Sequence, residues 1–250
     1  LRESNNLFKS LRTNNFLYYF LFLKLVEISY KNSILITPSK QLSISLKKKF
    51  GIKKKVFYLN NPVTIKNLNY NLKKKFDFIN IGSLTYQKDH FTLLKAFKKI
   101  HKKIKIRLLI IGYGPNKRKI INFILSNNLS KKVVVKSFKK NPYPYIKKSD
   151  LFVLSSKYEG LPNVLLEAIA LKKYVISSNC PTGPKEILGG GKYGTLFKIS
   201  NYNQLAKHII DFSKNKKTYK KKIYFAYKSL KRYDFNENCR KYMDLTKKFI

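Results

Sequence analysis

The sequence is 250 residues long and carries 54 lysine and arginine residues against 12 aspartate and glutamate residues, a formal net charge of +42. Apolar residues make up 44% of it, which is enough for a buried core and excludes a wholly disordered chain. Two cysteines and three histidines are too few for a disulfide framework or a zinc site. The most apolar run, residues 16–26, contains Lys24 and is shorter than the roughly 20 residues that a membrane span needs. We therefore expect a soluble cytoplasmic protein with one large domain or two small ones.

The basic excess consists almost wholly of lysine, because arginine accounts for only 6 of the 54 basic residues. Proteins that read bases rely on arginine, whose planar guanidinium matches guanine edges and phosphates with paired hydrogen bonds. The lysine runs also fall in predicted loops and at helix ends rather than along one stripe. We interpret the charge as a solvated basic surface, with attraction to the anionic face of a membrane as its functional reading. A basic nucleic-acid-binding α/β module stays open as the alternative.

The first 75 residues predict a short α/β segment, with helices over 16–29 and 40–50 and strands over 33–36 and 55–59. An Asn-Asn-Pro turn at 60–62 and a polar stretch follow the second strand. Two strands are too few to close a sheet, and the chain begins without an initiator methionine. We therefore expect residues 1–70 to be the tail of a truncated N-terminal Rossmann-like domain.

From residue 76 onward, short apolar runs alternate with amphipathic stretches. The apolar runs predict strands over 76–81, 107–111, 133–136, 151–154 and 174–177. Helices are predicted between them, among others over 91–100 and 117–126. Continuously apolar strands separated by helices are typical of parallel strands that are buried on both faces. We predict an α/β domain over residues 71–235, a Rossmann-like parallel sheet with helices on both faces, and a C-terminal helix within 236–250.

Acids are scarce, and two of the six glutamates flank the start of a predicted helix. Glu159 follows the strand at 151–154, and Glu167 lies five residues after Pro162, about 7 Å along a helix axis. A helix that begins at the carboxyl end of a parallel strand directs its free N–H groups at the ligand crevice, which suits a diphosphate. One carboxylate on each side of a diphosphate matches the two hydroxyl-rich groups of a nucleotide sugar. The alternative is that Glu159 is a loop acid and Glu167 an ordinary residue of a helix surface.

Two glycine turns follow other predicted strands. Gly82 and Ser83 end the strand at 76–81, and Lys88 follows in the loop. A lysine there can neutralise a leaving diphosphate, although a solvated loop charge is the alternative for one lysine among 48. The turn Gly112-Tyr113-Gly114-Pro115 follows the next strand and lets backbone approach a ligand without interference from a Cβ atom. Any tight turn would use such residues, so this second signal is weak by itself.

Together these segments resemble the retaining glycosyltransferases of family four, which have the GT-B fold of two facing Rossmann-like domains. Residues 155–168 resemble the family's Glu-x7-Glu segment over its whole length. Residues 82–88 are similar to the family's donor loop and residues 112–115 to its Gly-x-Gly-Pro turn. Weaker similarities lie at residues 60–63 and 180–187. The resemblance covers most of the chain, with the C-terminal donor-binding domain as its main part.

The resemblance implies a site for a nucleotide-diphosphate sugar, UDP- or GDP-linked. Glu159 would contact the transferred sugar as the catalytic residue, Glu167 the ribose, and Lys88 the phosphates. The other donor-binding residues that it implies are Gly82, Ser83, Gly112, Gly114, Pro115, Ser137, Phe138, Gly160, Leu161, Pro162, Asn163 and Val164. Ser83 stands where the family usually has an arginine, so diphosphate binding would depend more strongly on Lys88.

The resemblance also implies the reaction, a transfer with retention of configuration to a glycan or lipid-linked acceptor in surface polysaccharide assembly. No metal or other cofactor is expected, and the sequence contains no Asp-x-Asp pair for a catalytic Mg²⁺. The base of the donor would stack near residues 112–115 and the segment Ser137-Phe138. We expect a cytoplasmic protein with peripheral contact to an anionic membrane and no nucleic-acid partner.

Two other enzyme classes fit the sequence less well. A nicotinamide-dependent oxidoreductase uses a Gly-x-Gly-x-x-Gly turn after a strand. Residues 189–194 have this spelling but precede a predicted strand, and the turn at 112–115 lacks the third glycine. A two-carboxylate glycosidase needs both acids to face one bond across a cleft, which a strand-end residue and a mid-helix residue do not readily do.

Overall fold

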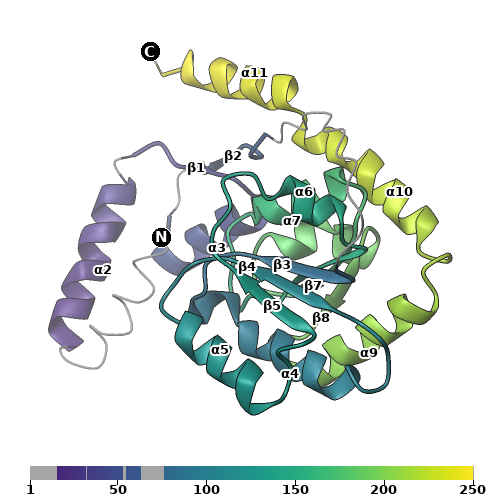
Figure 1. The fold of residues 1–250 in the computed structure, drawn as a ribbon. Helices are drawn as coiled ribbons and strands as arrows, with labels where there is room; N and C mark the ends of the chain where they lie inside the picture. The colour runs from purple at the N-terminus through teal and green to yellow at the C-terminus, as the bar shows by residue number, and fades with distance from the viewer. Residues whose placement is uncertain (1–15, 32, 53–54, 63–75, 250) are drawn as a thin grey trace. The chain divides into compact units, whose positions relative to one another are not determined.

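In the computed structural model the described residues are 16–31, 33–52, 55–62 and 76–249. They fall into two compact units that meet in sequence between Leu59 and Asn60, and each unit is described by itself (Figure 1). The domain boundary predicted at residue 70 lies among residues 63–75, outside the described ranges.

The described part of the first unit contains α2 (Phe16–Lys31), β1 (Ile36–Thr37), α3 (Lys40–Phe50) and β2 (Phe57–Tyr58). The two strands pair in parallel, and α3 contributes Leu46 and Phe50 to a small buried cluster. Ser39 caps α3, because its side chain accepts a hydrogen bond from the Leu42 N–H at 3.1 Å. The predicted order of helix, strand, helix and strand is confirmed, although both strands are shorter than predicted. None of the described helices is both long and apolar enough to cross a membrane.

The second unit is built on a parallel sheet with the strand order β5-β4-β3-β6-β7-β8. In chain order the strands are β3 (Phe78–Ile81), β4 (Leu108–Ile111), β5 (Val133–Lys136), β6 (Leu151–Leu154), β7 (Tyr174–Ser178) and β8 (Thr195–Phe197). The predicted parallel sheet is confirmed, and β8 is the strand that follows the glycine run at 189–194. The strands are found where the sequence places them because most are apolar runs, and β4 and β6 are buried along their whole length.

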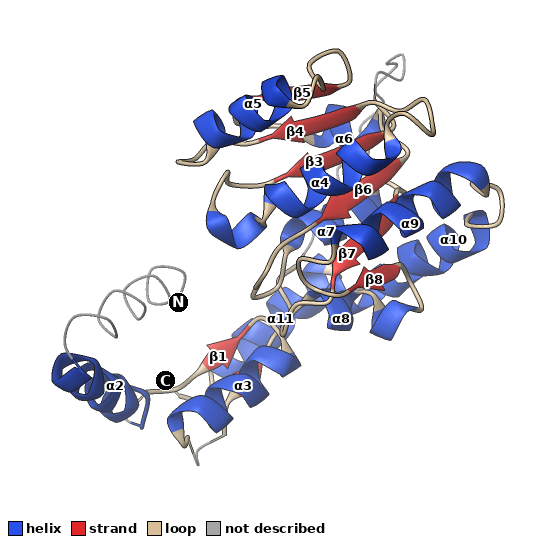
Figure 2. Ribbon diagram, turned by 90° about the horizontal axis from the view of Figure 1, so that it is seen from below, coloured by secondary structure: helices blue, strands red, loops and turns tan. Residues whose placement is uncertain are grey.

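Helices cover both faces of this sheet (Figures 1 and 2). One face, here called the α4 face, is covered by α4 (His90–Ile100), α5 (Lys117–Ser126) and α9 (Tyr202–Lys214). The opposite face, the α7 face, is covered by α6 (Tyr143–Lys147), α7 (Asn163–Ala170) and the short α8 (Pro184–Ile187). Successive strand residues point to opposite faces, so that two separate cores form on one sheet.

The C-terminal helices begin at the α4 face of the sheet and continue to the α7 face. In α10 (Lys220–Ser229), Ile223 borders the core of the α4 face, whereas Ala226 is buried in the core of the α7 face. A 3₁₀ turn, η3 (Leu230–Tyr233), then leads to α11 (Phe235–Thr246). Asp234 caps α11 by accepting a hydrogen bond from the Glu237 N–H at 2.9 Å, and the predicted last helix is confirmed.

Candidate active site

The loops after β3 and β6 lie against each other because these two strands are neighbours in the sheet. The loop after β3 contains a 3₁₀ turn, η1 (Tyr86–Lys88), and the loop after β6 leads to α7. The Lys157 N–H donates to the Gln87 carbonyl at 2.8 Å, and the Ser155 hydroxyl donates to the Lys88 carbonyl at 2.9 Å. The two loops are therefore held together at the carboxyl edge of the sheet, where ligands of open α/β sheets bind.

Lys88 and Glu159 form a buried ion pair between these loops. Their side chains are 8% and 1% exposed, and the Ser156 hydroxyl donates a further hydrogen bond to the Glu159 carboxylate at 2.7 Å. An isolated buried charge is very costly, whereas two opposite charges in contact compensate each other. The sequence predicts separate partners for the two residues, phosphate for Lys88 and sugar for Glu159, but the structure places them in contact with one another.

Two glycines allow the close approach of backbone and side chains at this corner. A Cβ atom on Gly82, after β3, would lie 3.3 Å from Cε of Lys88, so the lysine stem runs directly over this glycine. A Cβ atom on Gly112, after β4, would collide with the Gly82 carbonyl oxygen. Ser83 is exposed beside them, and its hydroxyl lies 3.4 Å from that of Thr85. The structure therefore brings Gly82, Lys88 and Gly112 together.

The turn at 112–115 and the segment Ser137-Phe138 follow neighbouring strands, β4 and β5. Gly114 has a φ of +156°, and a Cβ atom there would lie 2.7 Å from the Leu84 carbonyl oxygen, so the turn packs tightly on the loop after β3. Pro115 and Ser137 are exposed. Tyr113 and Phe138 are 74% and 71% exposed, so both aromatic rings are open to a planar partner.

The segment 160–163 leads from the ion pair into α7. Pro162 is the N-cap residue of α7, one position before the helical turn in which the sequence places it. Leu161 and Pro162 are buried, Val164 is half-buried, and Asn163 is exposed. The first N–H groups of α7 have no partner within the helix and stand at the same edge as the ion pair.

The loop after β7 packs against residues 159–162. The Thr182 hydroxyl donates to the Glu159 carbonyl oxygen. Gly183 has a φ of +87°, a conformation that residues with a side chain rarely adopt. A Cβ atom on Gly183 would also collide with the Gly160 carbonyl oxygen and lie 2.6 Å from Cδ of Pro162. Two loops that follow neighbouring strands are thus interlocked through backbone contacts.

Glu167 lies in α7 and makes contacts separate from those of Glu159. It is half-buried, and burial raises the pKa of its carboxyl group. The pKa of Tyr143, at the start of α6, is raised first by burial and then by the charge of Glu167. Glu159 thus precedes α7 in the chain and Glu167 lies within it, and only Glu159 belongs to the buried ion pair.

Three residues of the site were not predicted from the sequence, namely Ser156, Thr182 and His90. Hydroxyl residues directly after a buried strand are a usable signal for Ser156, because such residues favour loops in which they hold polar groups. His90 opens α4 and is 1% exposed, and neither ring nitrogen has a hydrogen-bond partner among the described residues. Its burial, and secondly the charge of Lys88, lower its pKa to about 4, so the ring is neutral at pH 7. Nothing in the local sequence indicates this burial.

Among the residues that the structure describes, no three acidic, histidine or cysteine side chains are gathered in a way that could hold a metal ion. Cys180 lies near the site, where burial raises the pKa of its thiol to about 12, with the Glu159 charge as the second cause. It is therefore a protonated, unreactive thiol at neutral pH.

The architecture is that of a Rossmann-like α/β domain with an ionic site at the carboxyl ends of its strands. The family model described as "Glycosyl transferases group 1" matches residues 64–229. The chain belongs to this family. Membership confirms that the segments at 82–88, 112–115 and 155–168 are those of a glycosyltransferase, and favours this class over the nucleic-acid-binding alternative.

Individual relatives agree with this assignment. An uncharacterised glycosyltransferase of Methanocaldococcus jannaschii is 39% identical over 158 residues, which are 58% of this chain and 39% of the relative. The N-acetylgalactosamine-N,N'-diacetylbacillosaminyl-diphospho-undecaprenol 4-alpha-N-acetylgalactosaminyltransferase of Campylobacter jejuni is 29% identical over 230 residues, 88% of this chain and 62% of the relative. The chain thus covers less than two thirds of the length of either relative.

The fold is shared with solved structures. The crystal structure of Anabaena HepE in complex with UDP and glucose superposes with a TM-score of 0.83 at 16% identity, over 90% of this chain and 66% of HepE. At this identity the likeness concerns the fold alone. It confirms the predicted fold class, a parallel α/β sheet covered by helices.

Proposed function

We propose that this chain provides the donor site of a retaining glycosyltransferase, which transfers a sugar from a nucleotide diphosphate to a glycan or lipid-linked acceptor without a metal ion. The observation that supports this most directly is the buried pair of Lys88 and Glu159 beside the start of α7. A cation, an acid and free helix N–H groups at one edge match the diphosphate and the sugar hydroxyls of such a donor.

The ion pair can be exchanged for donor contacts that keep both charged groups hydrogen-bonded. The diphosphate replaces Glu159 as the partner of Lys88, and sugar hydroxyl groups donate hydrogen bonds to the released Glu159 carboxylate. Both buried side chains therefore keep hydrogen-bond partners, which a buried charged group requires. Ser156 and Thr182 keep Glu159 in position during this exchange, through its carboxylate and its carbonyl oxygen respectively.

In the transfer itself, the bond between the anomeric carbon and the phosphate oxygen breaks and a bond to the acceptor oxygen forms. The proton of the acceptor hydroxyl passes to the leaving phosphate. Negative charge grows on the diphosphate, and Lys88 with the start of α7 stabilises it there. Glu159 orients the sugar, and transfer on one face of the ring retains the configuration.

The remaining residues predicted for the donor suit its nucleoside. Glu167 accepts hydrogen bonds from the ribose, and its half-buried place in α7 separates it from the sugar-binding acid. The open aromatic ring of Phe138 and the turn at 112–115 flank the base, UDP and GDP being the expected nucleotides. Gly160, Leu161 and the residues up to Val164 offer backbone groups to the sugar and the diphosphate.

The acceptor belongs to the lipid-linked or surface-glycan class. The name of the Campylobacter jejuni relative describes a saccharide on diphospho-undecaprenol as its substrate, and this supports a lipid-linked acceptor here. Such an acceptor lies in a membrane, so we place the protein in the cytoplasm in peripheral contact with the inner leaflet.

Donor binding tests the proposal without requiring transfer. Unfolding temperatures are measured with UDP, GDP, their sugar conjugates and, as a control nucleotide, ADP. A ligand at a hundredfold excess over its Kd stabilises the native chain by about 2.7 kcal/mol, so UDP or GDP should raise the unfolding temperature and ADP should not. Calorimetry then compares Glu167→Gln, which should bind the nucleotide roughly tenfold to a hundredfold more weakly through loss of charged hydrogen bonds.

Glu237→Gln is the matched control, because Glu237 lies in α11 with an exposed partner, Lys241. It should bind UDP or GDP as the unchanged chain does. An unchanged affinity of Glu167→Gln would refute the ribose contact. If no nucleotide or nucleotide sugar bound, and oligonucleotides bound in a salt-sensitive manner, the donor site itself would be refuted in favour of the basic binding module.

A further inference from the structure

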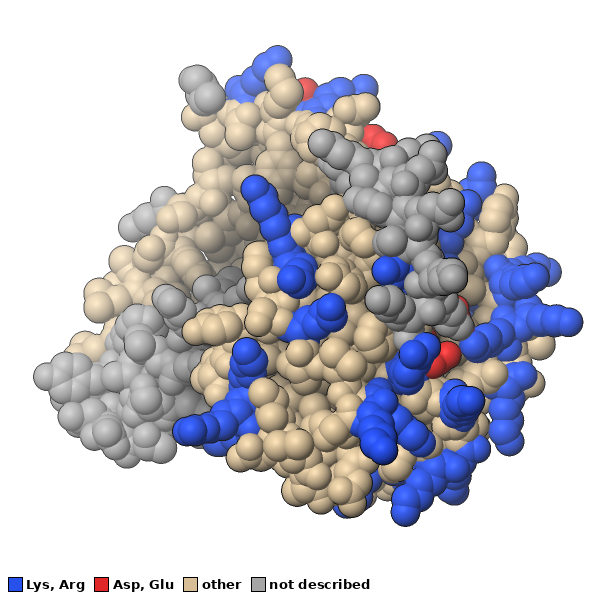
Figure 3. Space-filling model, in the orientation of Figure 1, with Lys and Arg blue, Asp and Glu red and all other residues tan. Residues whose placement is uncertain are grey.

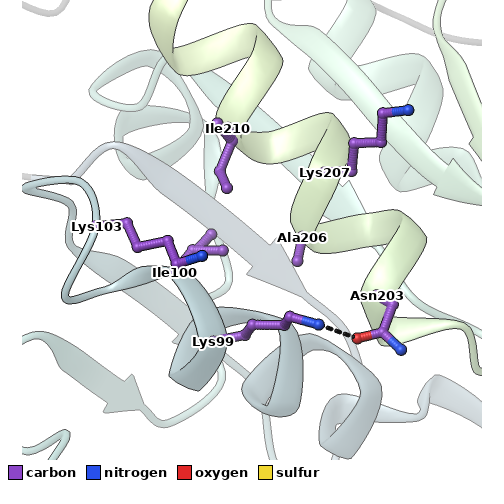
Figure 4. A pocket seen from close by; sticks show the side chains of 7 residues that line it. All are labelled: Lys99, Ile100, Lys103, Asn203, Ala206, Lys207 and Ile210. Atoms are coloured by element: carbon purple, nitrogen blue, oxygen red, sulfur yellow. Dashed lines mark hydrogen bonds between the residues drawn. The ribbon is translucent and has the colours of Figure 1, made fainter.

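A hollow of about 260 Å³ lies between α4 and α9 (Figure 4). Its base consists of three apolar residues, Ile100, Ala206 and Ile210. Four polar residues surround this base: Lys99, Lys103, Asn203 and Lys207. The apolar members belong to or border the core of the α4 face, whereas the lysines are exposed. The hollow therefore combines an apolar base with a cationic rim.

This hollow is separate from the candidate active site. α4 begins with His90, two residues after Lys88, and the pKa of its ring is lowered by burial and then by the charge of Lys88. The helix then runs from the carboxyl edge of the sheet toward the amino ends of the strands. Lys99 and Ile100 are its last residues and Lys103 lies in the following turn, so they stand toward the amino ends of the strands. A ligand of this hollow would leave the carboxyl edge of the sheet free.

Three of the residues that line the hollow are lysines. No acidic residue lines it. Lys99 reaches from α4 to α9 and donates a hydrogen bond to Asn203 Oδ1 at 2.6 Å, a neutral partner that positions the ammonium group without cancelling its charge (Figure 4). In α9, the carboxylate of Asp211 accepts hydrogen bonds from Tyr219 and Asn215 and also interacts with the charge of Lys207, so it offsets part of the positive charge at that end of the hollow.

The segment that contains α4 and α5 is strongly basic. Residues 90–149, which include α4 and α5, contain 15 lysines, 2 arginines and no aspartate or glutamate. Figure 3 shows basic side chains spread over the lower part of the molecule, where Figure 1 places α4, α5 and α9. Charges that are distributed in this way act together on a partner that is itself extended and anionic.

We propose that the hollow and the lysines around it bind the phosphate headgroups of an anionic membrane surface. The lysine ammonium groups are compact charges that pair with phosphate oxygens, and the apolar base accommodates the glycerol carbons of one headgroup. Several lysines on one face attract a charged bilayer in concert, and this attraction weakens with salt. The inference rests on the proposed function in one respect, since it names the surface that makes the membrane contact proposed there; vesicle binding tests it separately from nucleotide binding.

Vesicle binding of the intact chain tests this proposal. The chain is sedimented with vesicles of phosphatidylcholine and with vesicles that also contain phosphatidylglycerol, at low and at raised salt. Binding is expected only with phosphatidylglycerol and should weaken with salt. The double substitution Lys99→Glu and Lys103→Glu should lower the partition coefficient by at least about tenfold, since each nearby lysine contributes on the order of one kcal/mol. The unfolding temperature should stay the same, because both side chains are exposed.

A matched double substitution, Lys228→Glu and Lys231→Glu, produces the same change in net charge elsewhere. Both lysines are exposed, and they flank Leu230, which is buried in the core of the α7 face. This control should bind vesicles nearly as the unchanged chain does. Equal losses in the two variants would show attraction by net charge alone and overturn the proposal, as would failure to bind phosphatidylglycerol. Oligonucleotide binding that only the first variant loses, without vesicle binding, would reassign the hollow to nucleic acid.

Discussion

Lysine has two contrasting environments in the second unit of this chain. Lys88 is buried at the carboxyl edge of the sheet in contact with Glu159, whereas Lys99 and Lys103 are exposed at a hollow without an acidic lining residue. The buried lysine depends on its partner, since a charge in the interior must be compensated. The exposed lysines are solvated by water and act over a distance that salt shortens. The same side chain thus organises a site in one region and provides a surface potential in the other.

The largest expected effect comes from breaking the buried pair. Lys88→Met leaves the Glu159 carboxylate buried without a cation, which should lower the free energy of unfolding by about 3–5 kcal/mol. Urea unfolding followed by circular dichroism measures this difference. The double variant Lys88→Met and Glu159→Gln should recover part of the loss, because it removes both charges.

Lys99→Met is the control for this comparison, because it removes an exposed lysine. Its effect on the free energy of unfolding should stay within about 0.5 kcal/mol. If Lys88→Met were equally mild, the two environments would not differ energetically and charge compensation at the site would be contradicted.

The second effect concerns His90, which is buried beside Lys88 and Asp89. The pKa of its ring is lowered from 6.5 to about 4 in the folded chain. Between these values the unfolded chain binds the proton more readily, so stability is greatest above pH 6.5 and falls as the pH drops toward 4. The loss should reach about 3 kcal/mol once the pH is below 4. Urea unfolding over a pH series measures the slope.

His90→Asn should flatten this part of the pH profile, whereas His101→Asn should leave most of it, because His101 is far less buried. A slope that survives in His90→Asn would assign the pH dependence to other groups.

The smallest effect concerns the hydroxyl that holds Glu159. Ser156→Ala removes a hydrogen bond to a buried carboxylate, which should cost about 1.5–3 kcal/mol of stability. Ser156→Thr keeps the hydroxyl and should be milder, and Ser83→Ala, at an exposed serine, should be nearly neutral. The same urea titration compares the three variants. An equal response of Ser156→Ala and Ser83→Ala would mean that the ion pair needs no third partner.

Much of the fold could be predicted because its signals are local. The strands β5 and β6 and the helix α5 begin and end where the sequence predicts, since each apolar run or amphipathic stretch is bounded by polar residues. The short strands β1 and β2 were predicted too long, because their flanking residues have the same composition without pairing. The strand order was not predictable from periodicity, which describes each element but not its neighbours.

The candidate site, too, has features that local sequence predicts and features that it does not. The motif around Glu159 and Glu167 was recognisable from spacing and residue type within one segment. The contact of Glu159 with Lys88 joins residues 71 positions apart and exists only because β3 and β6 are neighbours in the sheet. The burial of this ion pair and of His90 is likewise a property of the packed domain. The sequence could therefore indicate Glu159 and Lys88 as site residues, but not that they are partners of each other.

The interlock at Gly183 carries a consequence for how such a site can change. The backbone at Gly183 lies against Gly160 and Pro162, and the neighbouring Thr182 donates a hydrogen bond to Glu159. The loop after β7 therefore restricts the conformation of the loop after β6. A mutation at residues 160–163 must still fit against the loop after β7. If the proposed donor role holds, new donor preferences should therefore arise through paired mutations in both loops, in evolution and in protein engineering alike.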